Sequence, residues 1–182
     1  MKKLTVGLNG FGRIGRAFAR IALSRGTFDI ALINTRKTPT HIMAYLLQYD
    51  SIYRKFEKTV VARDNAIDVD GVSIATSKVA SPEQIPWAQH NVDIVVDATG
   101  AFMTTGDLQK HTVGGSVKAV VLTAPAKDED GPDAKTVLMG VNEEDLKTCT
   151  LSSNGSCTTN SASPVMQVLS EKLGITKAFL NT

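Results

Sequence analysis

The sequence lacks several features that would assign it to particular classes of protein. Its only two cysteines, Cys149 and Cys157, form neither a disulfide framework nor the spacing of a zinc site, so we expect no metal and reduced thiols in a cytoplasmic protein. No apolar run approaches the ~18 residues that span a membrane. Residues 1–10, "MKKLTVGLNG", carry no long apolar stretch after their lysines, which favours a first strand over a signal peptide. The 20 basic and 18 acidic residues form no dense basic stripe, so we expect neither nucleic acid nor an anionic membrane as a partner.

The sequence does contain an alternation of strand and helix patterns. Short apolar runs typical of buried strands alternate with segments of helical period, and Asp70-Gly71 is a hairpin signal between two alternating strands. This order predicts an α/β fold, a doubly wound, mostly parallel sheet of the Rossmann type with an inserted β-hairpin. The expected strands lie at 4–8, 30–33, within 92–100, at 117–122 and at 136–139, and the expected helices begin at Arg13, His41 and Asp107.

The helix after the first strand gives a specific expectation about packing. Its apolar residues recur at helical spacing, and Gly26 is placed to end it. We therefore expect one buried stripe made of Ile14, Phe18, Ile21 and Ala22.

A further helix is expected near the end of the chain, with Pro164 in its first turn and Gly174 closing it. Residues 175–182, "ITKAFLNT", are then expected to begin a strand. We expect residues 1–156 to form a dinucleotide-binding domain and residues 157–182 to begin a second, catalytic domain whose remainder is absent. The apolar face of this helix is marked by Val165, Val168, Leu169 and Leu173.

The segment "GLNGFGRIGR", residues 7–16, has glycines at the spacing Gly10-x-Gly12-x-x-Gly15 between a strand and an amphipathic helix. Gly10 permits a tight turn, Gly12 lets a pyrophosphate approach the backbone, and Gly15 lets the helix lie against the strand. The N–H groups of the first helical turn would then hold the phosphates. The same glycines also suit a plain strand–helix turn, but their context favours dinucleotide binding.

The end of the second strand, "LINTRKT", departs from the usual dinucleotide pattern. An acidic residue about 20 residues after the glycine loop normally binds the adenosine ribose of NAD, but Thr35 stands there, followed by Arg36 and Lys37. Loss of a carboxylate removes repulsion toward a 2′-phosphate, and the two cations attract it. This suggests that the protein accepts NADP. The alternative is that Arg36 and Lys37 are solvated loop charges.

The segment "SNGSCTTN", residues 153–160, places Cys157 just before the last expected helix. The dipole at a helix N-terminus stabilises a thiolate, so we expect a lowered pKa and a reactive sulfur. The hydroxyls of Ser156, Thr158 and Thr159 could bind an anion, and the backbone N–H of Cys157 could face a developing oxyanion. The alternative is a small buried cysteine beside helix-capping threonines. Cys149 has no such setting, and we expect it in the core.

Together the two segments closely resemble the phosphorylating glyceraldehyde-3-phosphate dehydrogenase family. "NGFGRIGR" (9–16) is similar to the opening of that family, and "SNGSCTTN" to its active-site turn, with Gly155 where alanine is usual. The resemblance covers essentially the whole chain. Between the two segments, the motifs that follow in the family's order are "LLQYDS" (46–51), "IPW" (85–87), "DATGAF" (97–102), "TAPAKDED" (123–130) and "MGVNEEDL" (139–146).

The resemblance implies a homotetrameric enzyme that oxidises a phosphorylated aldehyde to an acyl phosphate, with NAD or NADP as cofactor and inorganic phosphate as second substrate. Cys157 would be the catalytic nucleophile and would form a thioester that phosphate then splits. Ser156 and Thr158 match residues that bind the attacking or the substrate phosphate, and Thr159 and Asn160 support the turn. Combined with the residue patterns above, the expected cofactor-binding residues are Asn9, Gly10, Phe11, Gly12, Arg13, Ile14, Asn34, Thr35, Arg36, Thr99, Gly100 and Thr123.

The catalytic histidine of the family lies a few residues past the strand that "AFLNT" begins, where this sequence stops. His41, His90 and His111 do not match its position, and we expect them at the surface or between domains. The resemblance therefore implies that the 182-residue chain alone lacks dehydrogenase activity. Two other functions fit the same motifs: an erythrose-4-phosphate dehydrogenase, and a non-catalytic dinucleotide-binding module or split subunit.

Overall fold

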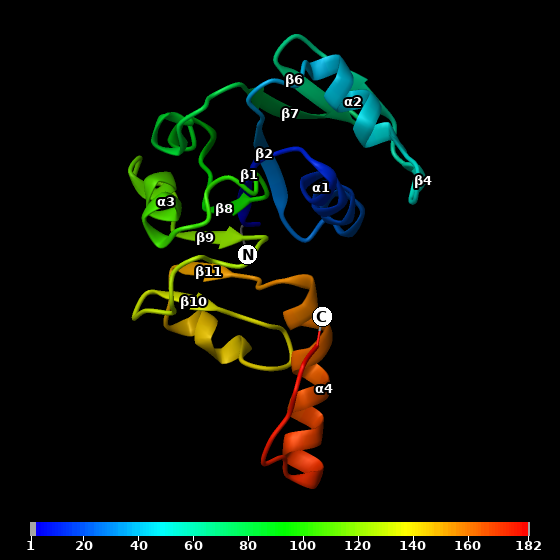
Figure 1. The fold of residues 1–182 in the computed structure, drawn as a ribbon. Helices are drawn as coiled ribbons and strands as arrows, with labels where there is room; N and C mark the ends of the chain where they lie inside the picture. The colour runs from blue at the N-terminus through cyan, green and yellow to red at the C-terminus, as the bar shows by residue number, and fades with distance from the viewer. Residues whose placement is uncertain (1–2, 182) are drawn as a thin grey trace.

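A computed structural model describes residues 3–181, and within them nine strands form one sheet in the order β10-β11-β9-β8-β1-β2-β7-β6-β5 (Figure 1). Neighbouring strands from β10 to β7 are all parallel, which confirms the predicted doubly wound sheet. A separate pair is formed by β3 (Tyr49–Asp50) and β4 (Arg54–Lys55). The strands of the sheet are β1 (Thr5–Asn9), β2 (Asp29–Asn34), β5 (Val60–Ala62), β6 (Ala66–Val69), β7 (Val72–Ser77), β8 (Ile94–Asp97), β9 (Ala119–Leu122), β10 (Ala134–Thr136) and β11 (Leu151–Ser153).

The predicted hairpin is present at one end of the sheet. β6 and β7 pair antiparallel, and the two turn residues, Asp70 and Gly71, have φ values of 49° and 83°. Positive φ at both positions is what a tight hairpin turn requires, which explains the Asp-Gly signal. At the other end, β10 ends at Thr136, three residues earlier than predicted for this strand. The chain bends there because the side chain of Asn142 donates to the carbonyl oxygen of Thr136 and accepts from the N–H of Leu138.

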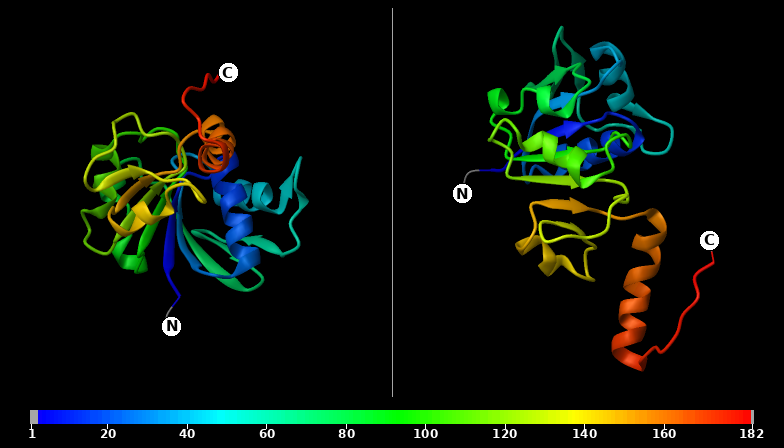
Figure 2. Two further views of the ribbon diagram at one scale, coloured as in Figure 1. Left: turned by 90° about the horizontal axis from the view of Figure 1, so that it is seen from below. Right: turned by 60° about the vertical axis from the view of Figure 1, so that its left-hand side comes forward.

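Helices cover both faces of the sheet and divide the core in two. α1 (Arg13–Arg25) and α2 (Thr40–Gln48) lie on one face, and α3 (Thr105–Gln109) lies on the other with short 3-10 turns (Figures 1 and 2). Successive strand residues point to opposite faces, so Val96 packs in the core under α1 while Val95 packs in the core under α3. The turns on this face are Pro82–Gln84, Ala88–His90 and Lys110–Thr112, and a further 3-10 turn, Glu143–Lys147, follows β10.

The buried stripe predicted for α1 is wrong at two positions, because Ile14 and Ile21 are 57% and 53% exposed. The helix lies too close to the sheet for large side chains: a Cβ added at Gly15 would lie 2.2 Å from the carbonyl oxygen of Gly10. Small residues and one arginine take the buried positions instead. These are Gly15, Ala19, Arg20 and Ala22.

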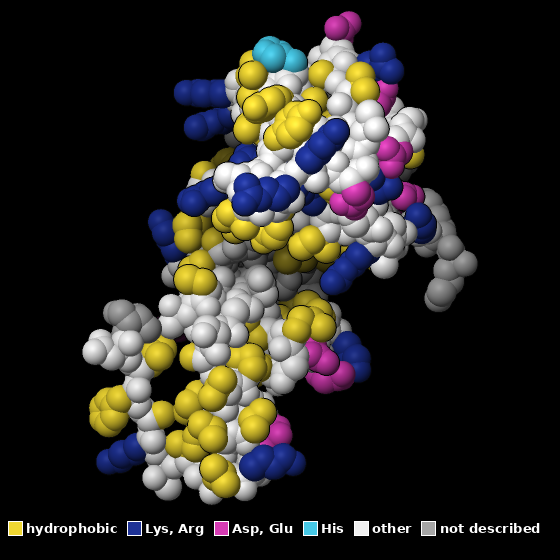
Figure 3. Space-filling view, turned by 90° about the vertical axis from the view of Figure 1, so that its right-hand side faces the viewer, with side chains coloured by type: hydrophobic (Ala, Val, Ile, Leu, Met, Phe, Trp, Pro, Cys, Tyr) yellow, Lys and Arg dark blue, Asp and Glu magenta, His cyan; other side chains and the backbone are white. Residues whose placement is uncertain are grey.

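α4 (Cys157–Leu173) extends away from the sheet, and none of its residues is buried (Figure 2, right). Pro164 lies inside it, so the predicted first-turn position is wrong. The reason is that the side chain of Ser156 caps the helix eight residues before Pro164. Residues 175–181 form no strand, contrary to expectation, and Thr182 lies outside the described residues. The expected apolar residues of this helix are present but exposed, and Figure 3 shows hydrophobic side chains along it.

None of the helices described between residues 3 and 181 is both long enough and apolar enough to span a bilayer.

Candidate functional site

The carboxyl ends of three neighbouring parallel strands meet at one edge of the sheet. β8, β1 and β2 end at Asp97, Asn9 and Asn34, and Asn9 is in register with both of the others. Ligands of open α/β sheets bind in the crevice outside such strand ends. A cavity of about 240 Å³ lies there, and the predicted cofactor residues that line it are Asn9, Gly10, Phe11, Gly12, Asn34, Thr35, Arg36 and Thr99.

Four predicted cofactor residues lie outside this cavity wall. Arg13 and Ile14 are exposed at the start of α1, and Gly100 is exposed in the turn after β8. Thr123, after β9, donates its hydroxyl to the carbonyl oxygen of Asp97 at 3.1 Å and lines a separate apolar cavity. The sequence patterns did not identify several other lining residues, although these follow closely on the ends of β7 and β8. They are Val79, Ala98, Ala101 and Phe102, and Ala80 lines the cavity beside Val79.

The three glycines of the first loop have different surroundings. Gly10 has φ +97°, and a Cβ there would lie 2.7 Å from the carbonyl carbon of Ala98. A Cβ at Gly15 would meet the backbone of Gly10, whereas a Cβ at Gly12 would meet nothing within 4 Å. Gly10 therefore makes the turn, Gly15 brings the helix close, and Gly12 leaves its space open beside the cavity. These are the three conditions that a bound diphosphate requires.

The start of α1 is suited to an anion. Gly12 occupies the N-cap position without a side-chain cap, and the first turn contains no acidic residue. The first N–H groups of a helix have no acceptor within it, and they carry a partial positive charge. These groups and the open space at Gly12 fit the phosphates of a dinucleotide.

The far end of the cavity, at the end of β2, is lined by Thr35 and Arg36. The backbone N–H of Thr35 donates to the carbonyl oxygen of Ser77 at 3.0 Å, which holds the loop on β7. Arg36 is exposed, and no described residue forms a hydrogen bond or ion pair with its guanidinium. None of the residues lining the cavity is acidic. This end can therefore accept a negatively charged group.

A buried carboxylate stands directly behind the cavity wall. Asp97 is completely buried, and its Oδ2 lies 2.8 Å from Asn9 Nδ2 and 3.2 Å from His111 Nε2. Its Oδ1 accepts from both the backbone N–H and the hydroxyl of Thr99, at 3.0 and 2.7 Å. The expectation of a surface or interdomain position is wrong for His111, which is only 1% exposed because it packs between Asp97 and Trp87. His41 is exposed and His90 half-buried.

The cysteine turn after β11 is held by local hydrogen bonds. Ser156 Oγ accepts from the N–H of Thr159 at 3.0 Å, and Asn160 Nδ2 donates to the carbonyl oxygens of Asn154 and Ser156. These bonds agree with the supporting role expected of Thr159 and Asn160. Cys157 is the first residue of α4 and is exposed, so the alternative of a small buried cysteine is wrong. Thr158 beside it is half-buried.

Cys149 differs from Cys157 in its surroundings. It is half-buried rather than a core residue, and burial raises the pKa of its thiol. Nearby Lys135 opposes this shift, while Asp133 and Asp145 add to it. Of the two cysteines, only Cys157 combines exposure with a helix N-terminus.

The glycine loop and the cysteine turn open on the same edge of the sheet. β11 and β1 are parallel members of one sheet, separated in order by β9 and β8. Three inter-strand steps of about 4.8 Å place the two loops about 14 Å apart across the sheet. An extended dinucleotide whose diphosphate lies at Gly12 could therefore reach toward Cys157.

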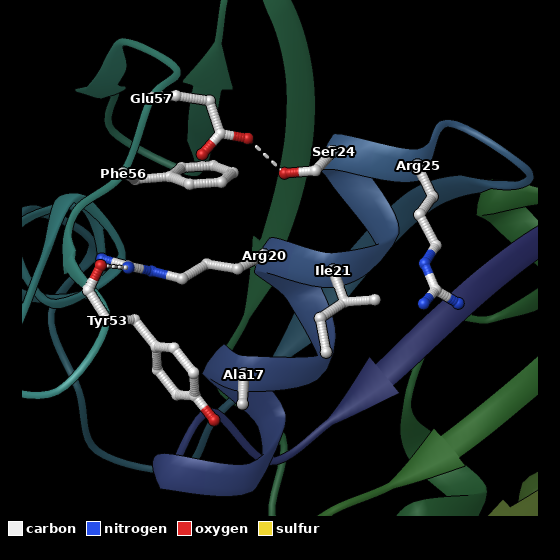
Figure 4. Close-up of a pocket in the computed structure, with 8 residues that line it drawn as sticks. All are labelled: Ala17, Arg20, Ile21, Ser24, Arg25, Tyr53, Phe56 and Glu57. Carbon is white, nitrogen blue, oxygen red and sulfur yellow. Dashed lines mark hydrogen bonds between the residues drawn. The ribbon is translucent and has the colours of Figure 1, made fainter.

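Another cavity, of about 330 Å³, lies on the outer side of α1 and contains none of the predicted site residues (Figure 4). Arg20 extends across it and donates to the carbonyl oxygens of Leu47 and Arg54, at 3.0 and 3.1 Å. Its guanidinium also lies over the ring of Phe56. Because the guanidinium of Arg20 already donates to these carbonyl oxygens, we assign Arg20 a structural role: it holds the β3–β4 segment against α1.

Comparison with known proteins identifies relatives of this chain. The family described as "Glyceraldehyde 3-phosphate dehydrogenase, NAD binding domain" matches residues 4–105. Glyceraldehyde-3-phosphate dehydrogenase 1 of Bacillus cereus is 41% identical over 97% of this chain and 52% of the relative. The glyceraldehyde-3-phosphate dehydrogenase of Debaryomyces hansenii is 39% identical over 98% and 52%, and that of Streptomyces coelicolor 41% over 98% and 52%. The chain thus spans about half the length of the curated relatives it matches. With its sheet, its glycine loop and its cysteine turn, the chain belongs to the glyceraldehyde-3-phosphate dehydrogenase family.

Proposed function

We propose that this chain supplies the cofactor site and the nucleophile of a cytoplasmic, phosphorylating glyceraldehyde-3-phosphate dehydrogenase. The observation that supports this most is the position of both loops at one sheet edge. An exposed cysteine at a helix N-terminus follows β11, and an open glycine loop follows β1. Ideal strand spacing puts the ends of these two strands about 14 Å apart. A covalent nucleophile and a redox dinucleotide at that separation suit the oxidation of an aldehyde.

In the proposed reaction, the Cys157 sulfur adds to the aldehyde carbon and forms a hemithioacetal. When bound, the cofactor accepts the hydride that leaves this carbon. The hemithioacetal hydroxyl loses its proton to water, so a thioester remains on Cys157. Inorganic phosphate then attacks the thioester carbon, releasing the acyl phosphate and restoring the thiolate. The backbone N–H of Cys157 would face the oxygen on which charge develops.

The anionic groups of the ligands have separate places in the proposal. The first turn of α1 and the backbone at Gly12 would hold the cofactor diphosphate. Thr158, together with Ser156, would face the substrate or attacking phosphate. Because the Ser156 hydroxyl already caps α4, it would bind phosphate only through its remaining hydrogen-bonding capacity.

We also propose that the site accepts the 2′-phosphate of NADP. The cavity end at Thr35 has no carboxylate to repel it, and Arg36 has no ion-pair partner among the described residues. Replacing Arg36 with alanine should weaken NADP binding about fivefold and leave NAD binding within twofold, since a partly exposed charge pair contributes about 1 kcal/mol. Equal losses for both cofactors would contradict this assignment, and Lys55→Ala, at an exposed cation outside the cavity, is the matched control.

Alkylation of Cys157 in the presence of cofactor tests whether the two loops form one site. Saturating NAD(P) should change the rate of reaction of Cys157 with iodoacetamide by about threefold or more. Cys149 in the same chain should react unchanged and serves as the internal control. Cofactor binding that leaves the rate of Cys157 unaltered would mean that the dinucleotide does not reach the cysteine turn, and would favour a non-catalytic binding module.

The proposed assembly is a homotetramer, as the family resemblance implies. Exposed apolar side chains at Ile52 and Tyr53, which are 79% and 64% exposed, give surface that subunit contacts could cover. Light scattering during size-exclusion chromatography would measure the assembly state, and a monomeric mass at micromolar concentration would contradict the proposal for this chain.

A further inference from the structure

A continuous chain of hydrogen bonds runs along the sheet edge behind the cofactor cavity. It begins at Trp87, whose indole Nε1 donates to His111 Nδ1 at 3.1 Å, and passes through Asp97 to Asn9. Asn34 Nδ2 then donates to Asn9 Oδ1 at 2.8 Å. At the far end, Asn34 Oδ1 accepts from the Ser77 hydroxyl and from the N–H of Val79, at 2.8 and 2.9 Å. The chain thus joins elements on both sides of the cavity.

The donor at one end of this chain fixes the tautomer of His111. An indole N–H can only donate, so the nitrogen that faces it, Nδ1, must be the acceptor. The proton of the neutral ring is therefore on Nε2, which faces Asp97 Oδ2. His111 consequently donates to Asp97 through a neutral N–H group.

Asp97 in turn fixes the orientation of the amides in the cavity floor. Its ionised carboxylate can only accept, so the NH₂ group of Asn9 must face it and the carbonyl oxygen of Asn9 must face Asn34. The same carboxylate holds the N–H and hydroxyl of Thr99. The Thr99 hydroxyl accepts from the N–H of Ala101, which closes the turn that forms one cavity wall.

We propose that Asp97 and His111 are positioning residues for the dinucleotide. Asp97 orients both the asparagine side chains of the cavity floor and the Thr99 turn. His111 donates a hydrogen bond to the Asp97 carboxylate, although His111 itself does not line the cavity. A buried carboxylate that loses a donor would draw Asn9 or Thr99 out of place to compensate. The inference rests on the proposed cofactor site.

Three single variants separate positioning from bulk stability. His111→Gln keeps an amide oxygen to accept from Trp87 and an NH₂ group to donate to Asp97, whereas His111→Leu keeps neither. Asp97→Asn keeps the size of the side chain, but its NH₂ group must face donors on one side, whichever way the amide is turned. His41→Leu, at an exposed histidine, is the matched control.

The dissociation constant of NADH is measured by fluorescence titration well below each melting temperature, with emission of Trp87, the only tryptophan, as a probe of its hydrogen bond. We expect His111→Leu and Asp97→Asn to weaken binding about tenfold, a typical result of unpairing a buried charged group. His111→Gln and His41→Leu should stay within about twofold of the unaltered chain.

The outcomes distinguish the two proposals. If the unaltered chain does not bind NADH, the proposed cofactor site itself is wrong. If the unaltered chain binds, but His111→Leu or Asp97→Asn folds and binds equally well, only the positioning inference is wrong. If His111→Leu fails to fold, the NADH affinities of Asp97→Asn and His111→Gln decide the question. If His111→Gln binds NADH as weakly as Asp97→Asn does, the positioning inference is also wrong.

Discussion

The glycine loop after β1 and the cysteine turn after β11 share one plan, a parallel strand followed by a turn and a helix, but their helices are held differently. α1 buries small residues such as Gly15 and Ala19 against the sheet, whereas no residue of α4 is buried. The cysteine turn relies on bonds made locally by Ser156 and Asn160. The comparison shows that the glycine loop is fixed by tertiary packing, while Cys157 is positioned by a short polar turn.

Adding one methyl group at Gly15 should break the first loop and gives the largest effect expected. The new Cβ would lie 2.2 Å from the carbonyl oxygen of Gly10, and backbone cannot yield without moving α1 off the sheet. We expect Gly15→Ala to lower the free energy of unfolding by about 3 kcal/mol. Urea denaturation followed by Trp87 emission measures this loss.

Gly106→Ala is the matched control for this change. Gly106 lies within α3, and a Cβ there meets nothing within 4 Å, so alanine should leave stability unchanged or raise it by up to about 1 kcal/mol. If Gly15→Ala proved as stable as Gly106→Ala, close packing would not be what holds the first loop.

The same methyl group at Gly12 should separate ligand binding from folding. Nothing lies within 4 Å of a Cβ there, and φ is −76°, so we expect stability to change by less than about 1 kcal/mol. The added carbon would occupy the space left for the diphosphate, and NADH affinity should fall about tenfold or more. Unchanged affinity in a fluorescence titration would mean that Gly12 faces away from the ligand.

Local patterns predicted the backbone of the glycine loop and of the hairpin, because the information for each lies within a few residues. The glycine spacing predicted the first turn, and Asp70-Gly71 predicted the hairpin whose positive φ values the structure shows. Partners distant in sequence were not predictable in this way. Arg20 is buried because its acceptors, Leu47 and Arg54, come from segments 27 and 34 residues away.

In the candidate site, too, some features were predictable from the sequence and others depended on partners distant in sequence. The residues at the strand ends, such as Asn9 and Asn34, were expected from the family resemblance, and the parallel sheet brings these strand ends together. The burial of His111 was not, since it depends on Trp87, which lies in a turn, and on Asp97, at the end of β8. The start of α4 was not predicted either. Pro164 suggested that the first helical turn lies there, but the helix already begins after its N-cap, Ser156.

The two cysteines sharpen the comparison at the second loop. Cys157 is exposed at the start of a helix. Burial raises the pKa of Cys149, so near pH 8 a smaller fraction of the Cys149 thiol is ionised than its ordinary pKa would give. We expect iodoacetamide to modify Cys157 at least about fivefold faster at pH 8, with the rate of Cys149 rising only at higher pH. Peptide mapping by mass spectrometry measures both rates. In urea the two rates should converge, and equal rates in the folded chain would contradict the difference in setting.

The smallest effect is expected on α4 itself. Val168 is 57% exposed, so Val168→Ala removes little buried surface and should change the free energy of unfolding by less than about 0.5 kcal/mol. Val95→Ala, at a fully buried position of the sheet, should cost about 2 kcal/mol and serves as the control. A loss above about 1 kcal/mol at Val168 would mean that the apolar stripe of α4 is covered in solution. The cysteine turn would then be held by packing just as the glycine loop is, and the difference between the two loops would disappear.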